Sequence, residues 1–153
     1  MKKSIPPTNH FTRTDHPTES KQTLLLIDDC LIITRTMARF FSQKLYNVLT
    51  SNQPIEAEQI ILKHTQPLII ISAIRMPGLN GLKLAESTFP HREQHHQPFL
   101  INSGSNDCEM NKLSQLKLYG IIHSFHNKGE FTIQHTIDTI SKQIKQSIPT
   151  NSI

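Results

Sequence analysis

Short, continuously apolar segments alternate with segments of helical periodicity along most of this chain, and this alternation constrains its fold more than any other feature. The apolar segments are Thr23–Asp29, Asn47–Ser51, Pro67–Ala73, Pro98–Gly104 and Ile121–Phe125. Strands that are apolar throughout are typical of parallel sheets, because both faces of such a sheet are covered. The alternation therefore predicts a doubly wound α/β fold with five parallel strands.

Each apolar segment precedes a sequence in which apolar residues recur every three or four positions, as in an amphipathic helix. The predicted helices are Leu31–Tyr46, Pro54–His64, Gly81–Phe89, Cys108–Gly120 and Phe131–Gln146. The residues predicted to face the core from these helices include Met37, Phe40 or Phe41, Leu45, Ala57, Met110, Leu113, Leu116, Ile133, Ile137, Ile140 and Ile144. Cys30, at the start of the first helix, is predicted to be a buried or half-buried thiol.

The chain has 153 residues, which suits a single domain. Residues 1–21 are rich in Pro, Thr, Asn and charge and are predicted to be a disordered leader. Residues 22–146 are predicted to form the folded domain, and 147–153 a flexible tail.

Composition narrows the functional classes. No apolar run approaches the ~20 residues of a membrane span, so no membrane association is expected. The two cysteines lack metal-like spacing, which favours a reduced, cytoplasmic setting. The net charge of +4 includes no dense basic stripe, so nucleic acid is not the expected partner. Binding of nucleic acid through Lys2, Lys3 and Arg13 of the leader stays open as a third interpretation.

Polar or small residues stand where the predicted strands end. Asp28 and Asp29 end the first, Ala73 the third and Ser103 the fourth, and Lys128 follows the fifth. In doubly wound folds the functional crevice lies at these carboxyl ends. The sequence therefore predicts that these side chains gather at one edge of the sheet.

Four features follow one another along the chain: the acid pair after an apolar strand, the MPGLNG segment (Met76–Gly81), the strand-end hydroxyl of Ser103 and the late Lys128. In this order they resemble the receiver domain of bacterial response regulators. The resemblance covers about residues 22–146. It implies the flavodoxin-like (βα)5 receiver fold, with the five parallel strands in the order 2-1-3-4-5. It also implies a role in two-component signalling, in which an aspartate accepts a phosphoryl group.

The resemblance further implies a role for each strand-end residue. Asp29 would bind Mg²⁺ directly, Asp28 would bind it through water, and the backbone carbonyl of Arg75 would supply another oxygen. Ser103 would bond a phosphoryl oxygen, and Lys128 would pair with the phosphoryl charge. Phe125 would be the aromatic residue that moves when the domain switches between its inactive and active states.

The chain departs from the family pattern at its central position. The phosphoacceptor aspartate belongs three residues before the Met of Met-Pro-Gly, and counting back from Met76 gives Ala73. No other acid lies between Pro67 and Gly78, so a shift of register restores none. Side chains alternate between faces along a strand, so Ser72 is expected to point away from the crevice. No catalytic residue is therefore expected, no cofactor is required, and any Mg²⁺ binding is expected to be weak.

Plainer interpretations of the same residues stay open. Asp28 and Asp29 could cap the following helix, and Ser103 could be a turn former. Phe125 could be ordinary core, and Lys128 could be a solvated loop lysine, since it stands one place later than in the family and is followed by Gly129 instead of Pro.

The segment HREQHHQ contains His91, His95 and His96, two of them at the four-residue spacing of a helical metal pair. Because it lies between Pro90 and Pro98 and no cysteine is near, a solvated loop is the preferred interpretation over a metal site.

The leading functional hypothesis is a stand-alone, degenerate receiver that is not an enzyme and acts through protein–protein interaction in a phosphorelay. Its expected partner is a histidine kinase or a downstream signalling protein. The expected surface comprises the fourth helix, fifth strand and fifth helix, with Lys112, Gln115, Tyr119, Phe125 and Lys142. The alternative is a Mg²⁺-dependent phosphohydrolase-like α/β enzyme with Asp28 as its nucleophile.

Overall fold

The computed structural model describes residues 20–104, 109–129 and 132–147. Its elements are β1 (Thr23–Ile27), α1 (Leu31–Ser42), β2 (Asn47–Ser51), α2 (Pro54–Lys63), β3 (Ile69–Ser72), α3 (Gly81–His95), β4 (Phe99–Ser103), α4 (Met110–Leu118), β5 (Ser124–Asn127) and α5 (Thr132–Ser147). The predicted leader lies outside the described residues except for its last two positions, and the predicted tail lies outside them except for Ser147.

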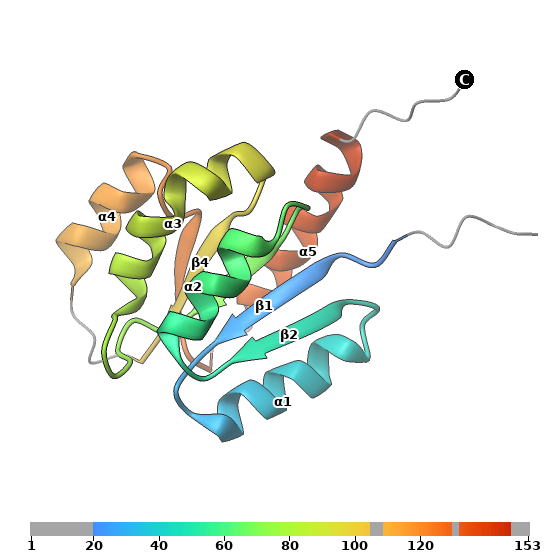
Figure 1. Ribbon diagram of the computed structural model, residues 1–153. Helices are drawn as coiled ribbons and strands as arrows, with labels where there is room; N and C mark the ends of the chain where they lie inside the picture. The colour runs from blue at the N-terminus through green and yellow to red at the C-terminus, as the bar shows by residue number, and fades with distance from the viewer. Residues whose placement is uncertain (1–19, 105–108, 130–131, 148–153) are drawn as a thin grey trace, which may run out of the picture.

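The five strands form one parallel sheet in the order β2-β1-β3-β4-β5 (Figure 1). Leu25 of β1 lies between Leu49 of β2 and Ile70 of β3, which places β1 inside the sheet. Each strand is followed by a helix, so the predicted doubly wound fold with strand order 2-1-3-4-5 is confirmed.

Helices cover both faces of the sheet, which explains why its inner strands are apolar throughout. On one face α2, α3 and α4 pack on alternate strand residues such as Leu25 and Ile70. On the other face α1 and α5 pack on Leu24 and Ile69. The four isoleucines predicted to face the core from α5 are all buried, as are Ala57, Leu113 and Leu116.

Several predictions about helix faces are wrong. Leu45 is 72% exposed because α1 ends at Ser42 and Leu45 adopts a left-handed turn (φ 71°) before β2. Met110 is 56% exposed at the first residue of α4, where the helix has not yet reached the sheet. Cys30 precedes α1 as its N-cap and is exposed, so it is not a buried thiol.

The fifth strand begins later than its apolar residues suggest. The amide of Ile121 donates to the Leu116 carbonyl (2.9 Å), and the amide of Gly120 donates to that of Lys117 (3.1 Å). With Gly120 at φ 74°, these bonds form a Schellman motif that ends α4. Ile121 therefore belongs to the helix cap, and β5 is Ser124–Asn127 instead of Ile121–Phe125.

Helix α3 continues to His95, so the predicted loop over HREQHHQ is wrong. Pro90 cannot donate the usual helical bond and crowds the preceding turn, which suggested an end to the helix. Arg92 holds the helix together instead: its guanidinium donates to Thr88 Oγ1 (2.9 Å) and to the carbonyls of Ala85 (2.6 Å) and Gln97 (3.1 Å).

Arg92 also joins α3 to the end of α4, because it donates to the Ile121 carbonyl at 2.8 Å. The side chain is buried and stacks against the ring of Phe99, and burial lowers its pKa to about 10. It therefore stays protonated at neutral pH.

Within the described part of the chain, no helix is both long and apolar enough to cross a bilayer.

Replacing Arg92 with alanine is expected to lower the free energy of unfolding by about 3 kcal/mol, because four buried acceptors lose a charged donor. Urea denaturation followed by circular dichroism measures this loss. Gln94→Ala, an exposed position on the same helical turn, is the matched control. Equal midpoints for the two variants would contradict the structural role of Arg92.

Candidate functional site

The carboxyl ends of the strands bring the predicted site residues to one edge of the sheet. The ladder continues one residue beyond each strand: the Asp28 amide donates to Ser51 O (3.2 Å), the Ala73 amide to Ile27 O (2.9 Å) and the Lys128 amide to Ser103 O (2.7 Å). Asp28 therefore lies between the ends of β2 and β3, and Lys128 lies beside the end of β4.

Asp28 is buried, with 5% of its surface exposed, and both of its carboxylate oxygens have partners. Oδ1 accepts a hydrogen bond from the Cys30 amide at 3.0 Å, and Oδ2 lies 2.8 Å from the Lys128 ammonium nitrogen. The N-cap of α1 is Cys30, whose side chain makes no capping hydrogen bond, so Asp28 binds the residue before the helix and does not cap its first turn.

Lys128 reaches Asp28 across two other strands. The order β1-β3-β4-β5 separates their strands by three spacings, or about 14 Å in a flat sheet, so only a long side chain curving over the strand ends can make this contact. The Lys128 side chain is 30% exposed and that of Asp28 is 7% exposed, so the pair is shielded from solvent on its acidic side. This contact distinguishes Lys128 from a solvated loop lysine.

Ala73 lies directly after β3 and is 4% exposed. Its methyl group borders a cavity of about 10 Å³, close to the volume of one water, which Asp28, Asn102 and Met37 also line. A longer side chain at this position would extend toward Asp28. The position offers no group that can accept a phosphoryl group.

The loop after Ala73 returns so closely that only glycine fits at the start of α3. A Cβ on Gly81 would lie 2.0 Å from the Ala73 carbonyl oxygen and 3.0 Å from Ser72 Oγ. Ser72 is fully buried beside this contact and donates to the Ala73 carbonyl at 2.8 Å. Ser72 therefore faces the start of α3 and not the crevice, in agreement with the alternation of strand side chains.

The remaining predicted residues do not all join this group. Asp29 and Arg75 are exposed, whereas Ser103 is 7% exposed at the end of β4. Phe125 is half-buried on β5, and the Lys117 ammonium lies 5.9 Å from the centre of its ring. The assigned roles of these residues toward metal or phosphate stay predictions.

Two neighbours of Asp28 were not found by sequence reasoning. The Asn52 side-chain amide donates to the backbone carbonyl of Asp28 (2.8 Å) and to Thr34 Oγ1 (3.0 Å), which ties the end of β2 to the first turn of α1. Asn52 follows directly on β2, so its position at a strand end was the available signal. Thr34 carried none, because it stands among apolar residues of a helix.

The residues at this edge do not fit the Mg²⁺ ion that the family resemblance implies. Mg²⁺ requires a near-octahedral shell of oxygen ligands. Asp28 already uses one oxygen for the Cys30 amide and the other for Lys128, and Ala73 offers no side-chain oxygen. Within the described ranges, no group of three or more His, Cys, Asp or Glu side chains could hold a metal ion. We therefore derive no chemical step through a metal.

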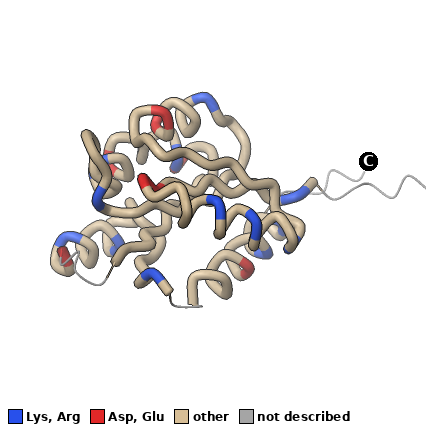
Figure 2. Tube along the Cα trace, turned by 90° about the horizontal axis from the view of Figure 1, so that it is seen from below, with Lys and Arg blue, Asp and Glu red and all other residues tan. Residues whose placement is uncertain are grey.

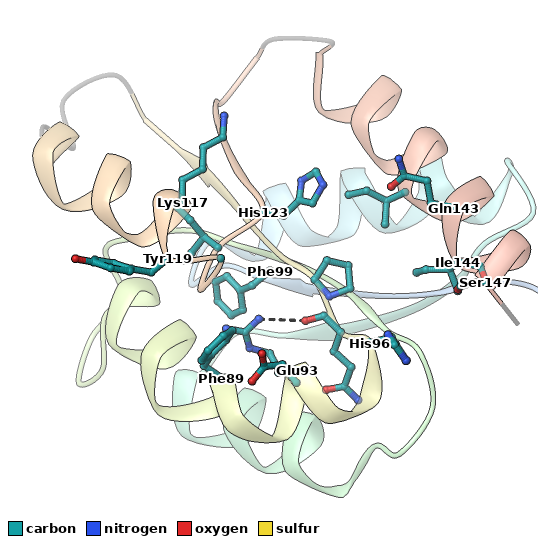
Figure 3. A pocket seen from close by; sticks show the side chains of 16 residues that line it. Phe89, Glu93, His96, Phe99, Lys117, Tyr119, His123, Gln143, Ile144 and Ser147 are labelled. Carbon is teal, nitrogen blue, oxygen red and sulfur yellow. Dashed lines mark hydrogen bonds between the residues drawn. The ribbon is translucent and has the colours of Figure 1, made fainter.

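A separate groove of about 600 Å³ lies at the opposite, amino-terminal edge of the sheet (Figure 3). Phe99, His123 and Ile144 contribute to its walls from β4, the α4–β5 connection and α5. Burial, followed by the positive charge of Lys117, lowers the pKa of His123. The groove is remote from the strand-end residues, and no sequence motif indicated it.

Charged residues of both signs are spread over several elements of the described chain (Figure 2). The ion pair between Lys112 of α4 and Glu86 of α3 (2.9 Å) is exposed on both sides, so it contributes little to stability. The Lys128–Asp28 pair differs from it by its buried carboxylate.

Comparisons with known proteins support the fold. No family model matches the sequence, and no curated protein matches it. A response regulator receiver domain from Clostridium thermocellum superposes with a TM-score of 0.70 at 18% identity, covering 82% of this chain and 98% of that one. The receiver domain of a Francisella response regulator gives a TM-score of 0.65 at 21% identity, with the same coverage of 82% and 98%.

A third similar structure is an adenylate cyclase from Rhodopirellula baltica, with a TM-score of 0.70 and 25% identity over 82% of this chain and 91% of that chain. Its activity belongs to that protein. Because most of these neighbours are receiver domains, the chain has the flavodoxin-like fold of response regulator receivers, as the sequence predicted.

Replacing Lys128 with alanine is expected to lower the free energy of unfolding by about 1–3 kcal/mol, because a buried carboxylate loses its counter-ion. Lys83→Ala, which removes an exposed lysine from α3, is the matched control and should change stability by less than about 0.5 kcal/mol. Chemical denaturation measures both. A change near zero for Lys128→Ala would show that the pair does not hold the fold.

Proposed function

We propose that this protein is a receiver-like signalling module that works without aspartyl phosphate, through contacts with a protein partner in a two-component pathway. The observation that carries the proposal is the methyl group of Ala73 at the end of β3, beside a buried Asp28. The receiver fold places the phosphoacceptor at this strand end. With alanine there, the crevice has the architecture of a receiver and lacks its nucleophile.

The acidic pocket of such a module has a structural task in place of a chemical one. Asp28 binds the Cys30 amide before α1 and the Lys128 ammonium after β5, so it joins the first and last strands of the fold. The carboxyl edge is thereby fixed in one arrangement. A ligand that binds two conformational states equally well does not change their populations. A phosphodonor therefore has no means of switching this protein between conformations.

The proposed docking surface is the α4–β5–α5 face, defined by Lys112, Gln115, Tyr119, Phe125 and Lys142. Four of these side chains are exposed, Tyr119 to 72%, and Phe125 is half-buried. An exposed tyrosine ring is the kind of residue that contributes most to protein–protein binding.

A phosphohydrolase with Asp28 as nucleophile is the second candidate, and the geometry supports it less. A nucleophilic carboxylate needs a free oxygen directed at the substrate. Both Asp28 oxygens have protein partners, and the side chain is 7% exposed. Turnover of a generic phosphomonoester that is lost in Asp28→Asn would favour this candidate over a signalling module.

Incubation with a small phosphodonor and Mg²⁺ is expected to leave the protein unmodified, because Ala73 has no nucleophile. Intact-mass spectrometry detects any added phosphoryl group, and an intact receiver domain treated in parallel shows that the donor is active. A hydroxylamine-labile adduct on any aspartate of this chain would refute the proposal.

Partner binding is expected to be independent of phosphodonor and to be lost in the double variant Tyr119→Ala, Lys112→Glu. The substitutions remove the exposed ring and reverse a charge on the α4–β5–α5 face. Affinity capture from the native cell, with quantitative mass spectrometry of the proteins retained, measures the effect.

Two variants serve as controls for that capture. Ile55→Ala removes an equally exposed apolar residue (68%) from α2, on a different surface, and should retain the partner. Asp28→Ala tests the acidic pocket. Retention by the α4–β5–α5 variant together with loss in Asp28→Ala would return the function to the pocket and make the proposed surface wrong.

A further inference from the structure

The acidic pocket contains its own cation. Two carboxylates, Asp28 and Asp29, directly follow β1, and their combined formal charge of −2 falls to −1 with the Lys128 ammonium. The ammonium lies 2.8 Å from Asp28 Oδ2, within charge-assisted hydrogen-bond distance. We propose that Lys128 is the resident cation of this pocket and keeps divalent metal ions out. The inference rests on the proposed function, which it deepens by explaining what replaces the metal.

The arrangement of partners suits an ammonium and not a divalent ion. An ammonium has three donors and needs no octahedral shell, so it can bind one carboxylate oxygen at the side of a crowded pocket. Mg²⁺ keeps most of its water and needs open space around its ligands. The cavity beside Ala73 holds about 10 Å³, and the second oxygen of Asp28 is already bound by the Cys30 amide.

The small side chain of Ala73 leaves room for the Lys128 side chain to reach Asp28. Lys128 starts beside Ser103 at the end of β4, and β3 with Ala73 lies between β4 and β1. A carboxylate at position 73 would meet the ammonium before Asp28 does and would compete for it. With a methyl group there, Asp28 is the buried acid that remains within reach.

Lys128 also connects the pocket to the proposed docking surface. Its amide donates to the Ser103 carbonyl (2.7 Å) and its side chain binds Asp28, so the first residue after β5 is fixed at two points. Phe125 lies three residues earlier, on β5. A lysine that binds the pocket permanently therefore holds this strand in one position without phosphate or metal.

The proposal predicts that removing the ammonium creates a metal site. Lys128→Met keeps an unbranched apolar stem that is one atom shorter, and should bind Mn²⁺ at least about tenfold more tightly than the wild type, because a unit positive charge leaves the pocket. Lys128→Arg keeps the cation and should remain as weak as the wild type. Lys63→Met removes an exposed lysine at the far end of α2 and is the charge-matched control.

Mn²⁺ titration followed by electron paramagnetic resonance of the free ion gives the affinities, with the full chain in every case. Equal affinities for wild type, Lys128→Met and Lys63→Met would overturn the proposal. Tight binding by the wild type would overturn it as well. Ala73→Asp, which adds a carboxylate, should bind more tightly than the wild type and more weakly than the double variant Ala73→Asp, Lys128→Met.

A second measurement needs no variant, in case Lys128→Met does not fold. Pulsed acetylation of wild-type amines, read by peptide mass spectrometry, should modify Lys128 more slowly than exposed Lys63. Adding Mg²⁺ should leave the Lys128 rate unchanged. A faster rate with Mg²⁺ would show that the metal displaces the lysine, and would refute the proposal.

These results are separable from a failure of the proposed function. Metal binding and amine reactivity do not depend on any partner protein, and a phosphoryl adduct is read in a different assay. Loss of the proposed signalling role with an unchanged metal result would leave Lys128 as the pocket cation. The reverse result would leave the docking surface standing.

Discussion

The burial of the sheet on both faces is the constraint on which the rest of this structure depends. Leu24, Leu25, Ile69 and Ile70 show no exposed surface, so neither face of the inner strands tolerates a polar side chain at those positions. On the inner strands β1, β3 and β4, polar side chains stand at or next to the strand ends. Asp28, Ser103 and Lys128 meet there because parallel strands direct all their carboxyl ends to one edge. The site is a consequence of how the core is built.

The same packing fixes the loop that borders the site. Gly81 touches the carbonyl of Ala73 so closely that no side chain fits, and its amide donates to the Ile74 carbonyl at 2.7 Å. The start of α3 is thereby held against the end of β3. A rigid scaffold at this point places residue 73 accurately, whichever side chain stands there. The identity of residue 73 can therefore change the chemistry of the edge without requiring a change in the fold.

The fold could be predicted from sequence because its signals are local and repeated. Apolar strands and the spacing of Ile133 to Ile144 each depend on one element. The errors arose at two helix ends, where a specific hydrogen-bond arrangement overrides the apolar or proline signal: Ile121 closes the cap of α4 instead of forming a strand, and Arg92 bonds carry α3 past Pro90. The contact of Lys128 with Asp28 joins residues 100 positions apart across two intervening strands. No sequence pattern indicates a contact between residues so far apart along the chain. The sequence therefore identified both residues as site candidates but could not predict that they pair.

The Lys128–Asp28 ion pair and the alanine at position 73 are related through the electrostatic energy of the pocket. A buried carboxylate without a counter-ion destabilises the fold, whereas a paired one contributes little net stability. The main effect of a cation beside Asp28 is therefore to remove a cost, and not to add stability. A pocket with a third acid at position 73 would exceed what one lysine neutralises and would need a divalent ion. With Ala73, a single ammonium satisfies the one buried acid. The methyl group of Ala73 and the turn of Lys128 toward β1 thus belong to one charge balance, in which one buried acid is paired with one ammonium.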